Sequence, residues 1–285
     1  MKYLAVILLI LTNAGETIGY KGATGNAKDV AWGVTFWSVI FSLPVSLALM
    51  FFMPHATSAI NWGQLGLLLI MSLIGVATIY FWAQASKHLP MSIAEGVSEI
   101  YIALLAIFCW LFFGKSLNIW QIVLISVVIM LCLILALAQC SPKSSTKYNT
   151  KLGFIFLAVW VGLSVIKGAL PSAITGLSAA TFVLGQNAIM LVVCLLIQNK
   201  RALPATKAAA KNPYIMFVAL CRVVSQLSIF YLASRINLGL ADAISVCGLV
   251  LIMLYERFVF KEKINPYCYP ILILLIAATA ALCVL

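Results

Sequence analysis

Long runs of apolar residues, separated by short polar connections, fill nearly all of this 285-residue chain. A helix needs about 20 mostly apolar residues to cross the roughly 30 Å of hydrocarbon in a bilayer. Open strands cannot cross it, because their backbone polar groups would remain unpaired. The pattern therefore predicts an all-α membrane protein. It predicts ten transmembrane helices, at about residues 3–21, 31–53, 63–86, 91–113, 117–138, 152–170, 176–198, 213–235, 241–260 and 266–285.

Short segments of the first half recur in the second half in the same order. AEGVS at 94–98 aligns with ADAIS at 241–245, and GKSLN at 114–118 aligns at the same offset with KEKIN at 261–265. These matches predict two repeats of five helices each. Because five is odd, the second repeat enters the membrane from the opposite side, which is the inverted-repeat plan of many secondary transporters. The predicted division is repeat 1 at 1–139, a connecting loop at 140–151 and repeat 2 at 152–285.

The composition agrees with a membrane-embedded chain. Apolar residues make up 64% and charged residues 9%, against about 45–50% and 25% in soluble domains. The net charge of +11 lies mostly in short connections such as 143–151 and 200–211, which is typical of membrane loops. We therefore expect the lipid bilayer, and no nucleic acid, among the partners of this chain.

Charged residues inside the apolar spans are the main candidates for function, because a charge at the centre of a bilayer costs about 2.5–3.5 kcal/mol on insertion scales. Glu95 and Glu99 lie one turn apart and share a helix face, and Asp242 is the repeat counterpart of Glu95. A carboxyl group desolvated between the two halves binds a proton more readily than one in water, which suits proton exchange against a cationic or zwitterionic substrate. The charged candidates are Glu16, Lys21, Glu95, Glu99, Lys167, Arg222 and Asp242.

Each of these charges also has a structural interpretation. Glu16 could pair with Lys21 or with another helix as a structural tie, and residues near helix ends could extend to the membrane interface. Aromatic residues accompany the charges and would suit an organic cation or an aromatic amino acid, or else form an interfacial belt. The remaining candidates are Tyr80, Trp82, Gln84, Tyr101, Trp160 and Tyr231. Small residues such as Gly15, Gly19 and Gly162 stand where helices could pack closely.

No sequence motif supports an enzyme. Walker A, H-E-x-x-H and G-x-S-x-G motifs do not occur. The cysteines fall mostly in apolar runs without a C-x-x-C pair, so we expect them to pack as small apolar residues. We therefore predict no catalytic residue, no metal and no cofactor.

The chain resembles the drug/metabolite transporter superfamily in its ten-helix EamA-like form. The resemblance lies in the spans, the two repeats, and FFGKSL at 112–117 with its counterpart FKEKI at 260–264. The first half is also similar to the small multidrug resistance proteins, in ETIG at 16–19 and YFWAQ at 80–84. The resemblance implies transport by alternating access, and it implies that both termini are cytoplasmic.

The distribution of basic residues predicts the opposite orientation. Outside the spans, the odd-numbered connections carry eleven Lys and Arg residues, and the termini and even-numbered connections carry three. By the positive-inside rule, both termini would then lie outside.

We expect a secondary active transporter for a small organic metabolite, namely an amino acid, an amine or another organic cation. Glu16, Glu95 and Glu99 would bind substrate or protons, with Asp242 and Lys167 on the opposite wall. The protein would be a monomer or homodimer in the bacterial inner membrane. The alternatives are an exporter or exchanger of larger metabolites or drugs, and an integral-membrane enzyme acting on lipid-linked substrates.

Overall fold

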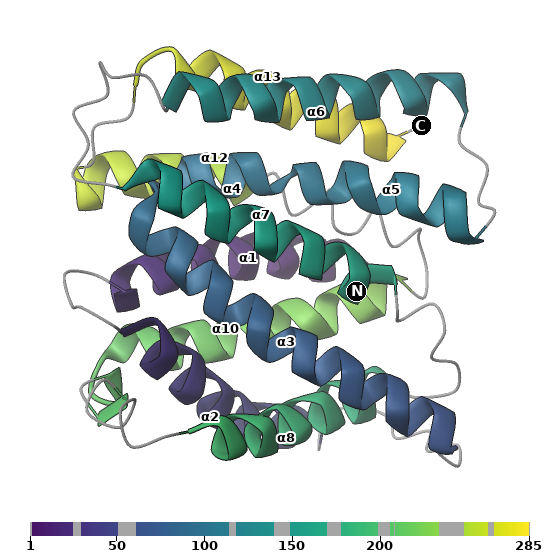
Figure 1. Cartoon of the computed structure of the whole chain (residues 1–285), viewed down its shortest axis with the longest axis vertical. Helices are drawn as coiled ribbons and strands as arrows, with labels where there is room; N and C mark the ends of the chain where they lie inside the picture. The colour runs from purple at the N-terminus through teal and green to yellow at the C-terminus, as the bar shows by residue number, and fades with distance from the viewer. Residues whose placement is uncertain are drawn as a thin grey trace.

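The computed structural model of the chain is a bundle of α-helices that run side by side (Figure 1). No β-strand occurs in the part of the chain that is described. The described residues are 2–24, 30–50, 61–113, 118–139, 149–169, 178–198, 206–207, 209–233, 248–261 and 265–284.

Helix occurs in each of the ten predicted apolar segments. The elements are α1 (Lys2–Thr24), α2 (Val30–Met50), α3 (Trp62–His88), α4 (Met91–Ser98), α5 (Ile100–Phe113), α6 (Ile119–Gln139), α7 (Thr150–Ala169), α8 (Ala179–Ile197), α10 (Pro213–Ala233), α12 (Gly248–Tyr255), the π-helix η2 (Glu256–Phe260) and α13 (Cys268–Val284).

Six helical stretches are long and apolar enough to cross a membrane. Large apolar side chains also cover the outside of the bundle, for example Leu137 at 72% exposure and Leu196 at 80%. Such a surface would be unfavourable in water and is matched by lipid. These features indicate a multi-pass membrane protein. The six stretches are Leu4–Thr24, Ala31–Ala48, Trp62–His88, Met91–Phe112, Ile119–Ala138 and Thr150–Ala169.

Two predicted spans depart from a regular helix. In the span at 91–113, the helix is interrupted at Glu99, between α4 and α5. The hydroxyl of Ser98 donates to the backbone oxygen of Glu95 at 2.7 Å, and such local bonds compete with the helical ladder. In the span at 241–260, the described helix begins at Gly248 and ends in η2, after which Lys261 has a φ of 51°.

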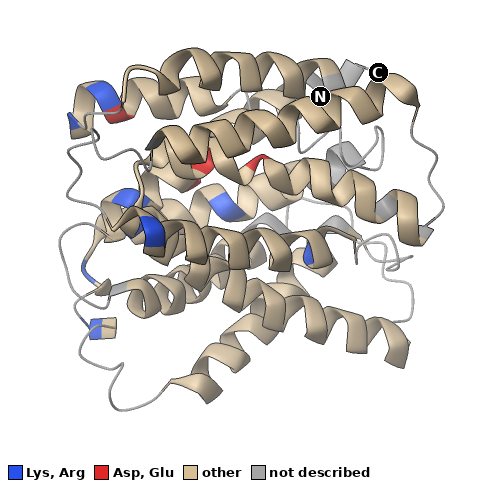
Figure 2. Cartoon of the chain, turned by 45° about the horizontal axis from the view of Figure 1, so that its top comes forward, with Lys and Arg blue, Asp and Glu red and all other residues tan. Residues whose placement is uncertain are grey.

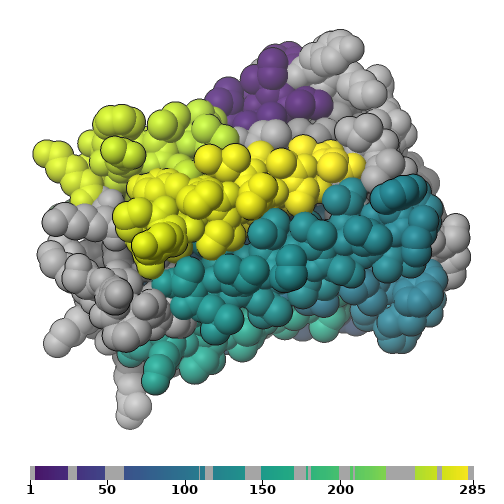
Figure 3. Space-filling model, turned by 90° about the horizontal axis from the view of Figure 1, so that it is seen from above, coloured from purple at the N-terminus to yellow at the C-terminus, as the bar shows by residue number. Residues whose placement is uncertain are grey.

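The helices form layers (Figure 1). At one edge α6 packs beside α13, and Figure 3 shows this pair covering a face of the molecule. At the opposite edge α2 packs against α8. Between these pairs lie the other helices, in which α1 pairs most extensively with α10 and α3 with α7.

Glycines bring α1 and α10 close together. A Cβ added at Gly19 would lie 2.5 Å from Val218 Cγ2, and one at Gly15 would lie 2.8 Å from Cys221 Sγ. Small residues allow this approach between membrane helices. The predicted close packing is thus confirmed at Gly15 and Gly19. It is wrong at Gly162, where an added Cβ would meet nothing within 4 Å.

Positive charge is unevenly distributed along the bundle. Most of the described Lys and Arg residues gather toward one end, on the left in Figure 2. The chain begins and finishes toward the other end, where the N and C marks lie (Figure 1). Charged side chains also lie in the interior (Figure 2), and the buried acids include Glu95, Glu99 and Glu256.

Candidate functional site

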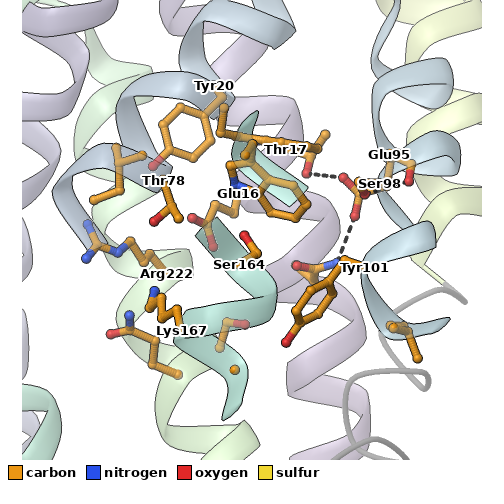
Figure 4. A pocket seen from close by; sticks show the side chains of 18 of the residues that line it. Glu16, Thr17, Tyr20, Thr78, Glu95, Ser98, Tyr101, Ser164, Lys167 and Arg222 are labelled. Atoms are coloured by element: carbon orange, nitrogen blue, oxygen red, sulfur yellow. Dashed lines mark hydrogen bonds between the residues drawn. The ribbon is translucent and has the colours of Figure 1, made fainter. Parts of the chain in front are cut away.

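A cavity of about 280 Å³ lies among the central helices α1, α3, α4, α5, α7, α8 and α10. Polar groups face each other across it, although the surrounding bundle is apolar (Figure 4). Its lining residues are Asn13, Glu16, Thr17, Tyr20, Met71, Thr78, Ile79, Trp82, Glu95, Ser98, Glu99, Tyr101, Ile102, Trp160, Ser164, Lys167, Gly168, Phe182, Gln186, Arg222, Ser225 and Gln226.

The cavity brings together most of the residues that the sequence singles out. The candidates that line it are Glu16, Trp82, Glu95, Glu99, Tyr101, Trp160, Lys167 and Arg222. Lys21, Tyr80 and Gln84 are not among the lining residues. Asp242 and the side chain of Tyr231 lie outside the described part of the chain.

One face of α1 lines the cavity with polar side chains. Asn13, Glu16, Thr17 and Tyr20 recur at the spacing of a single helix face. Asn13 Nδ2 donates to Oε1 of Glu95 at 3.0 Å, and Thr17 Oγ1 donates to Oε2 at 2.9 Å. Glu95 is 6% exposed, so these bonds hold its carboxylate against α1.

The carboxylate of Glu16 has a different environment. It points into the cavity between Glu95 on one side and the Arg222–Lys167 side on the other (Figure 4). Among the described residues it accepts no hydrogen bond and forms no ion pair. The tie to Lys21 does not form, because the Lys21 ammonium donates to the backbone oxygens of Ser86 and Leu89 at 3.0 and 2.9 Å.

Aromatic side chains form one wall of the cavity. The rings of Trp82 and Trp160 have centroids 4.7 Å apart, and those of Tyr101 and Trp160 are 6.1 Å apart. Aromatic faces of this kind attract organic cations. By contrast, Tyr80 packs on Trp32, with centroids 6.4 Å apart, and accepts a hydrogen bond from Gln84 at 3.0 Å.

The far end of the cavity is formed by α8 and α10. Arg222 is 3% exposed, and its Nη2 lies 3.5 Å from Asn187 Oδ1 and 3.2 Å from Met190 Sδ. Arg222 Nη1 and Gln186 Nε2 are buried and have no hydrogen-bond partner among the described residues. The charge of Arg222 inside an apolar span identifies it as a candidate from the sequence. Gln186 is not among the predicted residues, and the only sign of it in the sequence is an amide side chain inside the predicted span at 176–198.

A buried acid outside the cavity was also missed. Glu256 is fully buried and accepts bonds from the backbone nitrogens of Met91 at 2.6 Å and Ser92 at 3.1 Å, and from the Ser92 hydroxyl. A carboxylate is favourable there because the first amides of a helix lack partners within it. The signal for Glu256 was an acid near the end of the predicted ninth span. No cluster of three metal-binding side chains occurs in the described ranges.

Comparisons with known proteins identify the fold but no family. No protein-family model matches the chain, and no curated protein sequence matches it. Among solved structures, 28 chains match. One, described as "Crystal structure of protein", has a TM-score of 0.56 and 15% identity, over 99% of this chain and 96% of that one. At this identity the similarity concerns the fold alone, and it extends over the whole chain.

Proposed function

We propose that this protein is a secondary active transporter, rather than an enzyme, that moves a small organic metabolite across a membrane by alternating access. The cargo is an amino acid, an amine or another organic cation. The observation that carries this proposal is the Glu16 carboxylate, which faces a cavity inside an apolar bundle and has no hydrogen-bond partner among the described residues. An intramembrane charge is costly, and a ligand or proton would compensate it.

The helix pairing supports ten spans arranged as two inverted repeats. If the repeats are equivalent, α1 corresponds to α7, and α3 corresponds to α10. The pair α1–α10 then corresponds to the pair α7–α3, and these are the two most extensive pairs in the bundle. The pairs α2–α8 and α6–α13 each join a helix to its own counterpart. Substrate sites of such transporters lie between the repeats, and residues from both predicted halves of the chain line this cavity.

The size of the cavity favours a small cargo. Pockets for drug-sized ligands usually measure roughly 300–1,000 Å³, and this one has about 280 Å³. An amino acid or a simple amine fits this volume better than a nucleotide conjugate or a drug. The aromatic wall of Trp82, Tyr101 and Trp160 suits a cationic group next to the acids.

Glu16 is the group that couples transport to protons in this proposal. Its carboxylate binds either a proton or the cationic group of the cargo, so that each displaces the other. Acidification on the cargo side therefore weakens cargo binding. The proposed location is a bacterial inner membrane, as the resemblance to EamA-like transporters implies.

Uptake into proteoliposomes tests the proposal. A thermal-shift screen of amino acids, polyamines, choline-like cations and nucleotides first selects the cargo, which is then followed as a radiolabel with and without a pH gradient. We expect Glu16→Gln to lose most of the uptake and its dependence on the pH gradient, whereas Glu16→Asp keeps both in part. Unchanged pH-dependent uptake by Glu16→Gln would contradict the role of Glu16.

A further inference from the structure

The end of the cavity between α8 and α10 carries hydrogen-bond donors that the described part of the protein does not use. Arg222 is 3% exposed and Gln186 is 2% exposed, and both line the cavity. Their Nη1 and Nε2 atoms have no hydrogen-bond partner among the described residues. A buried donor without a partner is unfavourable, and more so when it is charged, so a ligand oxygen is the expected partner.

The protein does not neutralise the Arg222 guanidinium by direct contact. Its hydrogen-bonding neighbours are an amide oxygen of Asn187 at 3.5 Å and the sulfur of Met190 at 3.2 Å, both of which are uncharged. No ion pair joins Arg222 to Glu16, and Figure 4 shows its guanidinium at the side of the cavity away from Glu95. A charge in this setting can form a strong, charge-assisted bond with an anion.

The neighbouring helix α3 packs closely against this group of side chains at Gly75. Gly75 faces them, and a Cβ added there would lie 3.1 Å from Met190 Sδ and 3.5 Å from Gln186 Nε2. Met190 in turn contacts Arg222. The two donors therefore lie around the same methionine, beside α3, whose Met71 and Thr78 also line the cavity.

We infer that this end of the cavity binds the carboxylate of the cargo, so that the substrates are zwitterions of the amino-acid type. The ammonium group lies toward Glu16 and the aromatic wall, and the carboxylate oxygens lie toward Arg222 and Gln186. Arginine binds carboxylates with two aligned donors, and an amide on the facing helix adds a third. This inference rests on the proposed function, because it concerns the same cavity.

Matched ligand pairs test the inference by comparing each amino acid with its decarboxylated amine. The pairs are phenylalanine with phenethylamine, leucine with isopentylamine and lysine with cadaverine, each titrated into the purified, detergent-solubilised protein at constant pH. We expect at least one amino acid to bind about tenfold or more tightly than its amine. In Arg222→Gln that amino acid should lose about 10- to 100-fold in affinity, as loss of a charged hydrogen bond predicts, and the amine should change less than about threefold.

Two further variants keep the test decisive. Gln186→Leu removes the neutral donor and should reduce the amino-acid preference even if Arg222→Gln does not fold. Lys211→Gln removes an exposed cation just before α10 and should leave the preference unchanged. Equal binding of amines and amino acids by the wild type, binding of none of the six probes, or equal weakening of both ligands by Arg222→Gln would overturn the inference.

The outcomes also separate this inference from the proposed function. If transport is wrong and the carboxylate site is right, the preference for amino acids appears in detergent but vesicles accumulate nothing. If transport is right and the carboxylate site is wrong, vesicles accumulate amines as well as amino acids.

Discussion

At the scale of single residues, two of the carboxylates that line the cavity, Glu16 and Glu95, lie in contrasting environments. Glu95 accepts hydrogen bonds from Asn13 and Thr17, whereas Glu16 accepts none from the described residues. Environments that differ in this way assign different roles to chemically similar groups. Glu95 is held in place by α1, and Glu16 is the carboxylate to which the proposed function gives the binding of a proton or a cargo.

The bond between Thr17 and Glu95 gives a residue-scale prediction. Thr17→Val keeps the shape of the side chain but removes one donor, leaving a buried carboxylate oxygen with a lost hydrogen bond. We expect a loss of about 1–3 kcal/mol in the free energy of unfolding, measured as a lower midpoint of thermal unfolding in detergent. The matched control is Thr12→Val, because the Thr12 hydroxyl bonds the backbone of its own helix at 2.6 Å. Equal midpoints for the two variants would contradict the role of Thr17.

The sequence predicts much of the site because charges inside apolar spans stand out. Glu16, Glu99 and Arg222 are recognisable in this way, and all line the cavity. Neutral polar residues such as Gln186 give a weaker signal, since buried amides and hydroxyls are common inside helices. Lys21 has the same signal as the cavity residues, yet its ammonium binds the carbonyl groups at the end of α3. Only the packing of α1 against α3 distinguishes that role from a role in the cavity.

At the scale of elements, the junction of α3 and α4 is held by two buried charges from distant parts of the chain. Lys21 binds the carbonyl end of α3, and Glu256 binds the amide end of α4. Both charges oppose the partial charge of the helix end that they contact. The sequence predicts separate helices at 63–86 and 91–113. The two charges that cap the break between them lie 65 or more positions away along the chain. They could not be assigned to it without the tertiary structure.

The contact between α1 and α10 gives an element-scale prediction. Gly19→Ala adds a methyl group 2.5 Å from Val218 Cγ2, so the helices must separate or repack. Overpacking of this kind costs about 1–3 kcal/mol, which exceeds the gain of about 0.5–1 kcal/mol from replacing a helical glycine with alanine. We expect a lower thermal midpoint for Gly19→Ala.

Gly162 provides the matched control for that substitution. A Cβ at Gly162 meets nothing within 4 Å, so Gly162→Ala should keep only the helical gain and leave the thermal midpoint equal or higher. A midpoint for Gly19→Ala at or above that of Gly162→Ala would show that α1 and α10 do not approach as closely as the structure has them.

At the scale of the whole molecule, composition and periodicity are enough to predict an all-helical membrane protein. The hydrophobicity of each apolar run of about 20 residues is enough to predict that the run forms a helix, so each helix can be predicted separately. The pairing of α1 with α10 and α3 with α7 is not predictable in this way, because it depends on which small residues meet after folding. The cavity arises from that pairing, so its shape and volume could not be read from the sequence.

The uneven charge of the bundle gives the last prediction, which concerns orientation. Most described Lys and Arg residues lie toward the end opposite the chain termini, and cytoplasmic loops carry an excess of such residues. We therefore expect the end that carries Lys211 to face the cytoplasm and both termini to face outward, opposite to what the resemblance noted in the sequence implies. Labelling of single added cysteines with a membrane-impermeant maleimide, in intact bacterial cells, measures this. Asn118→Cys, just before α6, should react in intact cells, and Lys211→Cys should react only after permeabilisation, with the wild-type cysteines as the background. The reverse pattern would establish that both termini lie in the cytoplasm, and equal reactivity at both positions would contradict an arrangement of ten spans.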